Sequence, residues 1–183
     1  MNLGTKIFWI IWLLLFIVIS TVKIKRQAKH QSRYRAAKKV YRKINQIYAQ
    51  GNESKTMWIL SYLRKIDPFV FEELILYSMK RKGFKVWRNR RYTGDGGIDG
   101  RVRYNGEKFL IQAKRYSEHI KLSHVENFIK VCRKEKKRGF FIHTGKTGEE
   151  TRKLVRENPQ IIILSGWQLY NLFVESESLE IPG

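Results

Sequence analysis

Residues 7–22 form an uncharged run, IFWIIWLLLFIVISTV, which is stable only in a protein core or inside a membrane. The run is shorter than the roughly 20 residues of a usual membrane span. Lys6 and Lys23 bracket it, and both side chains can extend its reach toward the lipid headgroups. Trp9 and Trp12 lie toward its N-terminal end, where interfacial aromatic residues are common. The run therefore predicts an N-terminal transmembrane anchor.

Two other interpretations of this run remain open. A cleaved signal peptide would have a more basic beginning and a cleavage site with small residues. Here only Lys6 precedes the run, and the run ends Ser20-Thr21-Val22 without such a site. A buried core helix is the other alternative, but an apolar face at the extreme N-terminus makes it less favoured. We expect 7–22 to contact membrane lipid.

Charge sets the expected orientation of the anchor. The chain has 37 Lys and Arg residues against 16 Asp and Glu, a formal net charge of +21, which favours polyanionic partners. Residues 23–43 are rich in Lys and Arg and contain no Asp or Glu. Positive charge stays on the cytoplasmic side, so the sequence predicts a single-pass membrane protein whose C-terminal domain is cytoplasmic.

The segment 23–50 is itself predicted to be helical. Its apolar residues recur at spacings of three and four, namely Ala37, Val40, Tyr41, Ile44, Ile47 and Tyr48. We interpret it as a basic juxtamembrane helix lying along anionic lipid, with DNA contact as the alternative. Gly51-Asn52-Glu53-Ser54 has the composition of a hinge. The predicted domains are therefore an anchor at 1–22, a basic juxtamembrane helix and hinge at 23–55, and a soluble domain at 56–183.

The soluble domain has the pattern of an α/β fold. Asp67-Pro68 is a typical helix start, and that helix is expected to end at Gly83. The later elements follow in chain order: strands at 84–87, 98–104 and 107–114, a helix from 123 to about 138 ended by Gly139, a strand at 140–142, a helix at 149–157, a strand at 161–164 and a helix from Trp167. A strand, a helix and a strand in succession predict a parallel pair, so the fold class is a mixed sheet flanked by helices. The single cysteine, Cys132, excludes an intrachain disulfide and is expected to be buried.

Asn105-Gly106 is the strongest short hairpin signal in the chain. If these two residues form the turn, Asp99 faces Gln112 across the hairpin. Opposed side chains lie roughly 5 Å apart on one face of a sheet. Side chains alternate with period two, so Lys114 shares that face. The turn is thus predicted to bring together a carboxylate, an amide oxygen and an ammonium group.

Such a trio is typical of metal-dependent phosphodiester hydrolysis. A carboxylate holds a hard divalent cation, Mg²⁺ or Mn²⁺, and the lysine positions water or stabilises the negative charge of the transition state. One carboxylate rarely suffices for the metal. Glu72 on the first helix of the soluble domain is the best second ligand, with Glu73 as its rival.

Three motifs resemble the Mrr-like restriction endonuclease family of the PD-(D/E)xK nuclease superfamily: FEEL at 71–74, GDGGIDG at 94–100 and QAKRY at 112–116. The resemblance covers about residues 66–175. It implies a restriction-endonuclease-like fold and Mg²⁺-dependent cleavage of DNA. It assigns metal binding to Asp99 and the catalytic amine to Lys114. It further implies that Gln112 replaces the usual acidic residue and that Glu72 is the helical glutamate. Ile98 stands where the superfamily has proline.

Residues around this site have less specific interpretations. Five are expected to contact DNA phosphates, with plain surface solvation as the alternative: Arg88, Arg90, Arg91, Arg115 and Tyr116. Asp95 is interpreted as a turn residue, and the surrounding glycines as permitting tight backbone near the scissile phosphate. His119, His124 and His143 show no ligand spacing and are interpreted as structural.

The sequence therefore predicts a membrane-anchored DNA endonuclease that acts on double-stranded DNA, with restriction of foreign or modified DNA as its role. The first alternative is a nuclease fold that holds DNA at the membrane without cutting it. The second is a membrane-surface scaffold whose charge contacts lipid only. The oligomeric state is left open, with a homodimer as one alternative.

Overall fold

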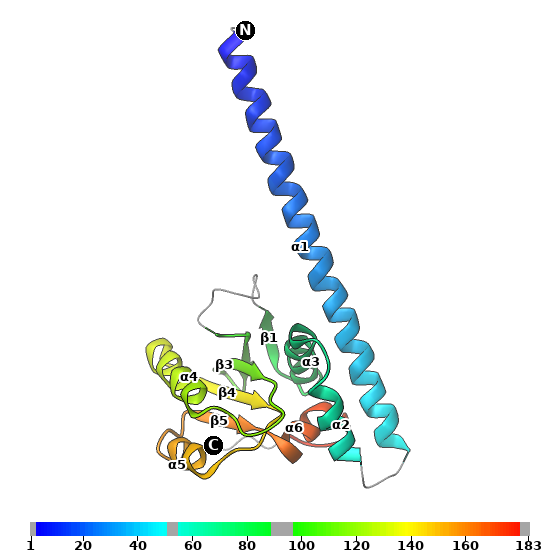
Figure 1. Ribbon diagram of the computed structural model, residues 1–183, viewed down its shortest axis with the longest axis vertical. Helices are drawn as coiled ribbons and strands as arrows, with labels where there is room; N and C mark the ends of the chain where they lie inside the picture. Colours follow the sequence, from blue (N-terminus) through cyan, green and yellow to red (C-terminus); the bar gives the residue numbers. More distant parts are fainter. Residues whose placement is uncertain (1–2, 51–54, 89–96, 180–183) are drawn as a thin grey trace.

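The computed structural model describes residues 3–50, 55–88 and 97–179 (Figure 1). Over these residues the order of elements agrees with the sequence prediction, with one further short helix, α2. The helices are α1 (Leu3–Ala49), α2 (Lys55–Leu63), α3 (Pro68–Arg81), α4 (Leu122–Glu135), α5 (Glu149–Arg156) and α6 (Gly166–Phe173). The strands are β1 (Lys85–Arg88), β2 (Gly100–Tyr104), β3 (Glu107–Lys114), β4 (Arg138–His143) and β5 (Ile161–Leu164).

The strands form a mixed sheet in the order β1-β2-β3-β4-β5. The first three strands pair antiparallel, and β3, β4 and β5 pair parallel. The predicted parallel pair of β4 and β5 is confirmed, and so is the α/β fold class. The carboxyl ends of β3 and β4 lie side by side, where Lys114 is paired with His143.

The β2–β3 hairpin has the register that the Asn-Gly pair predicts. Asn105 has a φ of 46° and Gly106 a φ of 84°, and both positive values are what a two-residue type I′ turn requires. Tyr104 is paired with Glu107, and the pairing continues to Gly100 opposite Ile111. The register fixes which side chains of β2 and β3 face each side of the sheet.

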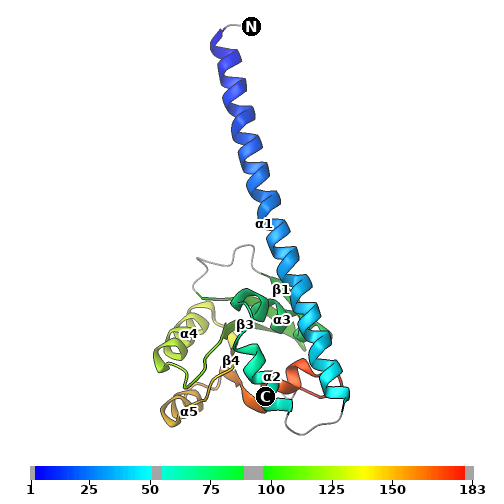
Figure 2. The same cartoon turned by 45° about the vertical axis from the view of Figure 1, so that its right-hand side comes forward.

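Helices cover both faces of the sheet (Figures 1 and 2). One hydrophobic cluster joins α1, α2, α3 and α6 to side chains such as Val102, Phe109 and Ile111. A second cluster lies on the other face, where α4 and α5 pack against Leu110 and Phe141. Successive residues of β3 thus contribute to opposite cores, as the period of a strand dictates.

Helix α1 is continuous from Leu3 to Ala49, and its last third belongs to the core of the soluble domain. Ala37, Val40, Tyr41 and Ile44 are each less than 9% exposed and pack with α3 and α6. The helical prediction for 23–50 is confirmed, but its placement along lipid is wrong, because this apolar stripe packs against the domain. The core therefore crosses the predicted boundary at residue 55, while the expected hinge at 51–54 lies outside the described residues.

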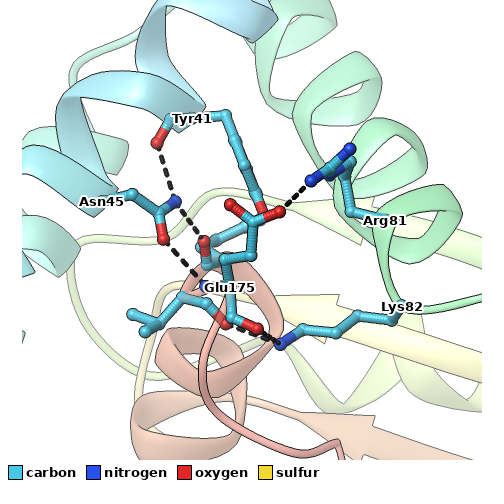
Figure 3. A network of polar contacts seen from close by, with 7 residues as sticks. Tyr41, Asn45, Arg81, Lys82 and Glu175 are labelled. Atoms are coloured by element: carbon cyan, nitrogen blue, oxygen red, sulfur yellow. Dashed lines mark hydrogen bonds and ion pairs between the residues drawn. The ribbon is translucent and has the colours of Figure 1, made fainter.

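Polar contacts fasten the end of α1 to the segment that follows α6 (Figure 3). The Asn45 amide donates to the carbonyl oxygens of Tyr41 and Phe173, both at 2.9 Å, and its oxygen accepts from the Glu175 N–H at 2.8 Å. From α3, the Arg81 guanidinium pairs with the Glu175 carboxylate. Just beyond α3, Lys82 donates to the Val174 carbonyl oxygen at 2.6 Å. Asn45 thereby satisfies a carbonyl that the end of α6 leaves without a helical partner.

The structure confirms the predicted start of α3 and contradicts the predicted end of α4. Asp67 caps α3 as predicted, because its carboxylate accepts from the N–H groups of Phe69 and Val70. The end predicted at Gly139 is wrong, since α4 ends at the left-handed Lys136. Gly139 lies inside β4, where a Cβ would come within 2.6 Å of Cys132 Sγ. Its role is to let α4 approach the sheet.

Replacement of Ile44 by alanine tests the packing of α1 on the soluble domain. Ile44 has no exposed surface, so the Ile44→Ala cavity should lower the free energy of unfolding by about 2–5 kcal/mol. Lys39→Ala, on the exposed side of the same helix, should change it by less than about 0.5 kcal/mol. Urea unfolding of the full chain in detergent micelles measures both. Equal effects would show that α1 does not share the core.

Candidate active site

Asp99 lies directly before β2, and its carboxylate is fixed on the neighbouring strand. Asp99 Oδ2 accepts a hydrogen bond from the Ala113 N–H at 2.7 Å, and the Asp99 N–H donates to the Ile111 carbonyl oxygen at 2.8 Å. Strand pairing ends at Gly100, so the predicted direct pair of Asp99 with Gln112 is not formed. The side chain instead reaches the backbone between Gln112 and Lys114. The carboxylate and the Gln-x-Lys segment are therefore brought together, through a different contact.

Gln112 is 7% exposed, and only one end of its amide is satisfied. Its Nε2 donates to the Gly97 carbonyl oxygen at 2.7 Å. Its Oε1 is buried without a hydrogen-bond partner among the described residues. Buried polar atoms nearly always have a hydrogen-bond partner. An oxygen without one therefore indicates a place where a ligand can bind to its lone pairs.

Gln112 and Lys114 share one face of the sheet, as predicted. Phe109, Ile111 and Ala113 belong to the cluster under α3, whereas Leu110 belongs to the cluster under α4. By alternation the side chains of Gln112 and Lys114 point to the α4 side. The pKa of His124 on α4 is lowered mainly by burial. The positive charge of Lys114 lowers it further.

The oxygen atoms of this site suit a hard divalent cation. The Asp99 carboxylate and the orphaned Gln112 Oε1 are the ligand types that Mg²⁺ prefers, and Mg²⁺ usually keeps several waters. Among the residues that the structure describes, no group of three or more His, Cys, Asp or Glu side chains could hold a metal ion. A cation here would thus rely on few protein ligands, which is compatible with ligands supplied by water and a phosphate.

The two acids of α3 have separate environments. Glu73 is 1% exposed, and its carboxylate pairs with Arg88 Nε at 2.8 Å and with His30 Nδ1 at 3.1 Å. Glu73 therefore links α1, α3 and β1 and is not the metal ligand that we considered as the rival. Glu72 is half-buried on the same helix, and its role as second metal ligand stays a prediction.

Three of the residues expected to contact phosphates have partners within the protein. Arg115 directs Nη1 to the carbonyl oxygens of Arg64 and Ile66, so it clamps the turn between α2 and α3. Arg88 is engaged by Glu73. The hydroxyl of Tyr116 contacts His124 Nδ1 within the protein. These three donors are used inside the fold, whereas the expectations for Arg90, Arg91 and Asp95 fall outside the described residues.

Two glycines of the GDGGIDG motif serve packing. Gly97 has a φ of +81°, and a Cβ there would lie 2.6 Å from Gln112 Nε2. Gly100 lies under α3, where a Cβ would lie 2.6 Å from a methyl carbon of Leu76. The first glycine leaves room for the Gln112 amide and the second lets α3 approach β2. Their role is therefore more local than the approach to a phosphate that we expected.

Sequence reasoning missed the residues that fix the strand beside Lys114. The Thr144 hydroxyl accepts from the Tyr116 N–H and donates to the Tyr116 carbonyl oxygen, both at 2.9 Å. His143, the partner of Lys114 in the parallel register, is fully buried, and its Nε2 lies 3.1 Å from Thr147 Oγ1. The signal was present, because His143 and Thr144 end a buried strand beside the Gln-x-Lys strand.

Comparisons with known proteins identify the family and a similar fold. A model of the Mrr_cat family, described as a restriction endonuclease, matches residues 63–173. The solved structure of MspJI restriction endonuclease in complex with a 27-mer oligonucleotide is similar, with a TM-score of 0.55 and 20% sequence identity. That match covers 68% of this chain and 32% of the MspJI chain, so this chain spans about a third of that relative. SfsA from Pyrococcus furiosus in complex with Ca²⁺ matches with a TM-score of 0.36 and 14% identity, over 52% of this chain and 54% of that one. None of the curated proteins matches.

A methyl group at Gly97 tests the fit of the Gln112 amide. In Gly97→Ala the new Cβ meets Nε2, and a side chain is strained at this φ, so the free energy of unfolding should fall by about 1–3 kcal/mol. Gly148→Ala is the control, because its φ is −73° and the nearest atom is 3.8 Å away. Chemical unfolding of the full chain compares the two variants. A Gly97→Ala protein as stable as the control would contradict the close approach.

Burial of His143 predicts a loss of stability in acid. Burial lowers the pKa of His143 from 6.5 to about 4, so the folded protein holds the neutral imidazole. As the pH falls, His143 is protonated in the unfolded chain before it is protonated in the folded protein. The stability that the neutral buried imidazole contributes, about 3 kcal/mol in all, is therefore lost as the pH falls from 6.5 toward 4. Unfolding free energies of wild type and His143→Gln measured across this range should show a shallower dependence in the variant. The exposed His119 offers the control, since His119→Gln should keep the full slope.

Proposed function

The chain belongs to the restriction endonuclease family whose model covers residues 63–173, and on this premise we propose that it is a metal-dependent DNA endonuclease held at a membrane by residues 7–22. One observation carries the proposal. The Asp99 carboxylate is bonded to the backbone N–H between Gln112 and Lys114. The Asp99 carboxylate is thus held against the strand that carries the Gln112 amide and the Lys114 amine, the three groups that phosphodiester hydrolysis uses.

Asp99 and Gln112 are the residues proposed to hold the metal, with Glu72 as a further ligand. When bound, a divalent cation such as Mg²⁺ or Mn²⁺ would supply Lewis acidity and make water a better nucleophile. The hydrogen bond from Ala113 restrains the Asp99 carboxylate before any ligand arrives. The hydrogen bond to Gly97 turns the Gln112 amide so that Oε1 stays without a protein partner among the described residues. The two side chains are therefore preorganised to bind a cation.

Lys114 is the proposed catalytic amine. It ends β3, and its backbone carbonyl oxygen accepts from the Thr144 N–H at 3.3 Å. An ammonium group at this place would stabilise the negative charge that develops on the phosphoryl oxygens. It would also position the attacking water by hydrogen bonding. The lowered pKa of nearby His124 leaves that imidazole neutral at pH 7, so it does not add a second positive charge beside Lys114.

DNA is the proposed substrate. The similar MspJI structure contains an oligonucleotide, and the family is one of restriction endonucleases. The excess of Lys and Arg that gives the net charge of +21 extends beyond the segment near the membrane. The soluble part is therefore basic on its own. Basic charge favours the phosphate backbone without specifying a sequence. We therefore propose double-stranded DNA, with restriction of foreign or modified DNA as the biological role.

The proposal of a membrane anchor is supported by the exposed apolar surface of α1. Every side chain from Ile7 to Ile19 is exposed, and α1 alone among the described helices is long and apolar enough to cross a membrane. Such a surface on a soluble protein would be an aggregation hazard, whereas lipid covers it. The basic segment that follows favours a cytoplasmic position for the nuclease domain.

Loss of the Lys114 amine should abolish cleavage without unfolding the protein. Lys114→Ala is expected to lower the rate of plasmid cutting by at least about 100-fold, because the transition state loses the ammonium group that stabilises its negative charge. Asp99→Asn keeps an oxygen for the Ala113 N–H but loses the charge that holds a metal, so cutting should fall similarly. The full chain in detergent is assayed on methylated and unmethylated plasmid, with Mg²⁺, Mn²⁺ or a chelator.

Lys130→Ala, on the exposed side of α4, is the matched control and should cut as fast as wild type. Unchanged cutting by Lys114→Ala would refute the site. DNA binding without cutting by the wild type would favour the non-cleaving alternative.

A further inference from the structure

A row of cationic side chains lies on the uncovered part of the sheet. The register pairs Lys85 with Arg103, Trp87 with Arg101, and Arg103 with Lys108. Paired residues point to the same side, so these five side chains share one face. The alternate residues Val86 and Val102 pack into the cluster under α3. The five side chains therefore lie on the α4 side of the sheet, and we call this surface the basic sheet face.

The basic sheet face is open because α4 and α5 do not cover it. Those helices pack over β4 and β5, where the buried residues of the second cluster lie. Lys85, Arg103 and Lys108 are exposed, and Trp87 is 40% exposed. A hollow of about 340 Å³ is lined by Trp87, Arg101, Arg103, Lys108 and Lys137. This face can therefore receive a ligand without displacing a packed element.

The charge of the face is strongly positive. The four basic strand residues are joined by Lys137, which follows α4 and lines the same hollow. The neighbouring acids are engaged by cations at the border, since Glu135 pairs with Lys137 at 3.0 Å and Glu107 with Arg138 at 3.4 Å. Among the residues that the structure describes, Lys85, Arg103 and Lys108 form no ion pair with a carboxylate. The complementary ligand is a polyanion.

Trp87 narrows the choice of polyanion. Two cations lie over its ring, with Lys85 Nζ at 5.5 Å and Arg103 Cζ at 5.9 Å from the ring centroid. An exposed aromatic ring within a positive surface is the combination that binds single-stranded nucleic acid, since the ring stacks on a base and the cations hold phosphates. In a duplex the bases are already stacked on each other. Lipid is disfavoured, because α1 lies on the opposite side of the sheet, where it packs on α3 and α6.

The face continues from the candidate active site. Arg101 is two residues beyond Asp99, a rise of about 7 Å along an extended strand, and Arg103 is about 14 Å away. A strand of DNA cut near Asp99 could thus run along β2 toward the hairpin tip. We propose that the basic sheet face binds a single-stranded segment of DNA next to the site of cleavage, with Trp87 stacking on a base and Arg103 and Lys108 holding phosphates. This inference rests on the proposed function, because it takes Asp99 as the cleavage site.

The experiment measures binding of the full chain in detergent to fluorescent oligo-dT and to a blunt duplex, with a chelator present so that no cutting occurs. Trp87→Ala should weaken oligo-dT binding about tenfold and duplex binding less than about twofold. Arg103→Ala should weaken oligo-dT binding and lower its salt dependence by about one contact. Trp167→Ala is the matched control, since Trp167 is 58% exposed on α6 over the other face, and it should change neither affinity.

Equal weakening of oligo-dT and duplex by Trp87→Ala would overturn the single-strand assignment, and so would oligo-dT binding that no variant changes. Far-ultraviolet circular dichroism checks that each variant keeps its fold. The two proposals fail separately. If cutting depends on Lys114 but Trp87→Ala has no effect on binding, only this inference is removed. Loss of oligo-dT binding in Trp87→Ala together with no cutting by wild type would remove the endonuclease and leave the basic sheet face as a single-strand binding surface without a cleavage site beside it.

Discussion

The left-handed pair at Asn105 and Gly106 is the constraint on which the rest of the site depends. Both residues have positive φ, so the turn closes with two residues and fixes the register of β2 against β3. A slip by one residue would send every side chain of the hairpin to the other face. The same register buries Val102 under α3, directs Arg103 to the open side, and brings Asp99 to the backbone of Ala113. Core, candidate active site and basic sheet face thus have one origin.

The second constraint is that α1, which carries the proposed anchor, and the soluble domain share a core. Because α1 is continuous, its rise from Lys23 to Ala37 is about 21 Å, and the domain is held at that order of distance from the predicted membrane surface. Asn45 and the contacts of Glu175 tie the end of this helix to the segment after α6. A flexible linker would let the domain rotate freely, whereas a helix buried along one side restricts it. The side of the sheet that carries Lys114 faces away from α1.

Much of this arrangement could be predicted because its signals are local. The Asn-Gly pair, the Asp67 cap and the order of strands and helices each depend on neighbours in the chain. The failures are tertiary. An amphipathic stripe on α1 has the same spacing whether it meets lipid or protein. The donors of Arg115 are taken by carbonyl groups 49 and 51 residues away, which composition cannot reveal. The basic sheet face was missed because its members are spread over three strands and Lys137.

The neighbouring acids Glu72 and Glu73 show how burial divides roles that the sequence leaves equal. Glu73 is removed from water, and a buried carboxylate is tolerated only with close cations. Arg88 at the end of β1 is such a cation, and His30 from α1 is a second partner at 3.1 Å; removing one partner of a buried ion pair typically costs about 3–5 kcal/mol. Arg88 is also the last residue of β1, the strand that precedes the GDGGIDG motif in the chain. One carboxylate therefore couples α1 to the strand that precedes this motif, so the position of the proposed anchor and the position of the candidate site depend on the same packing.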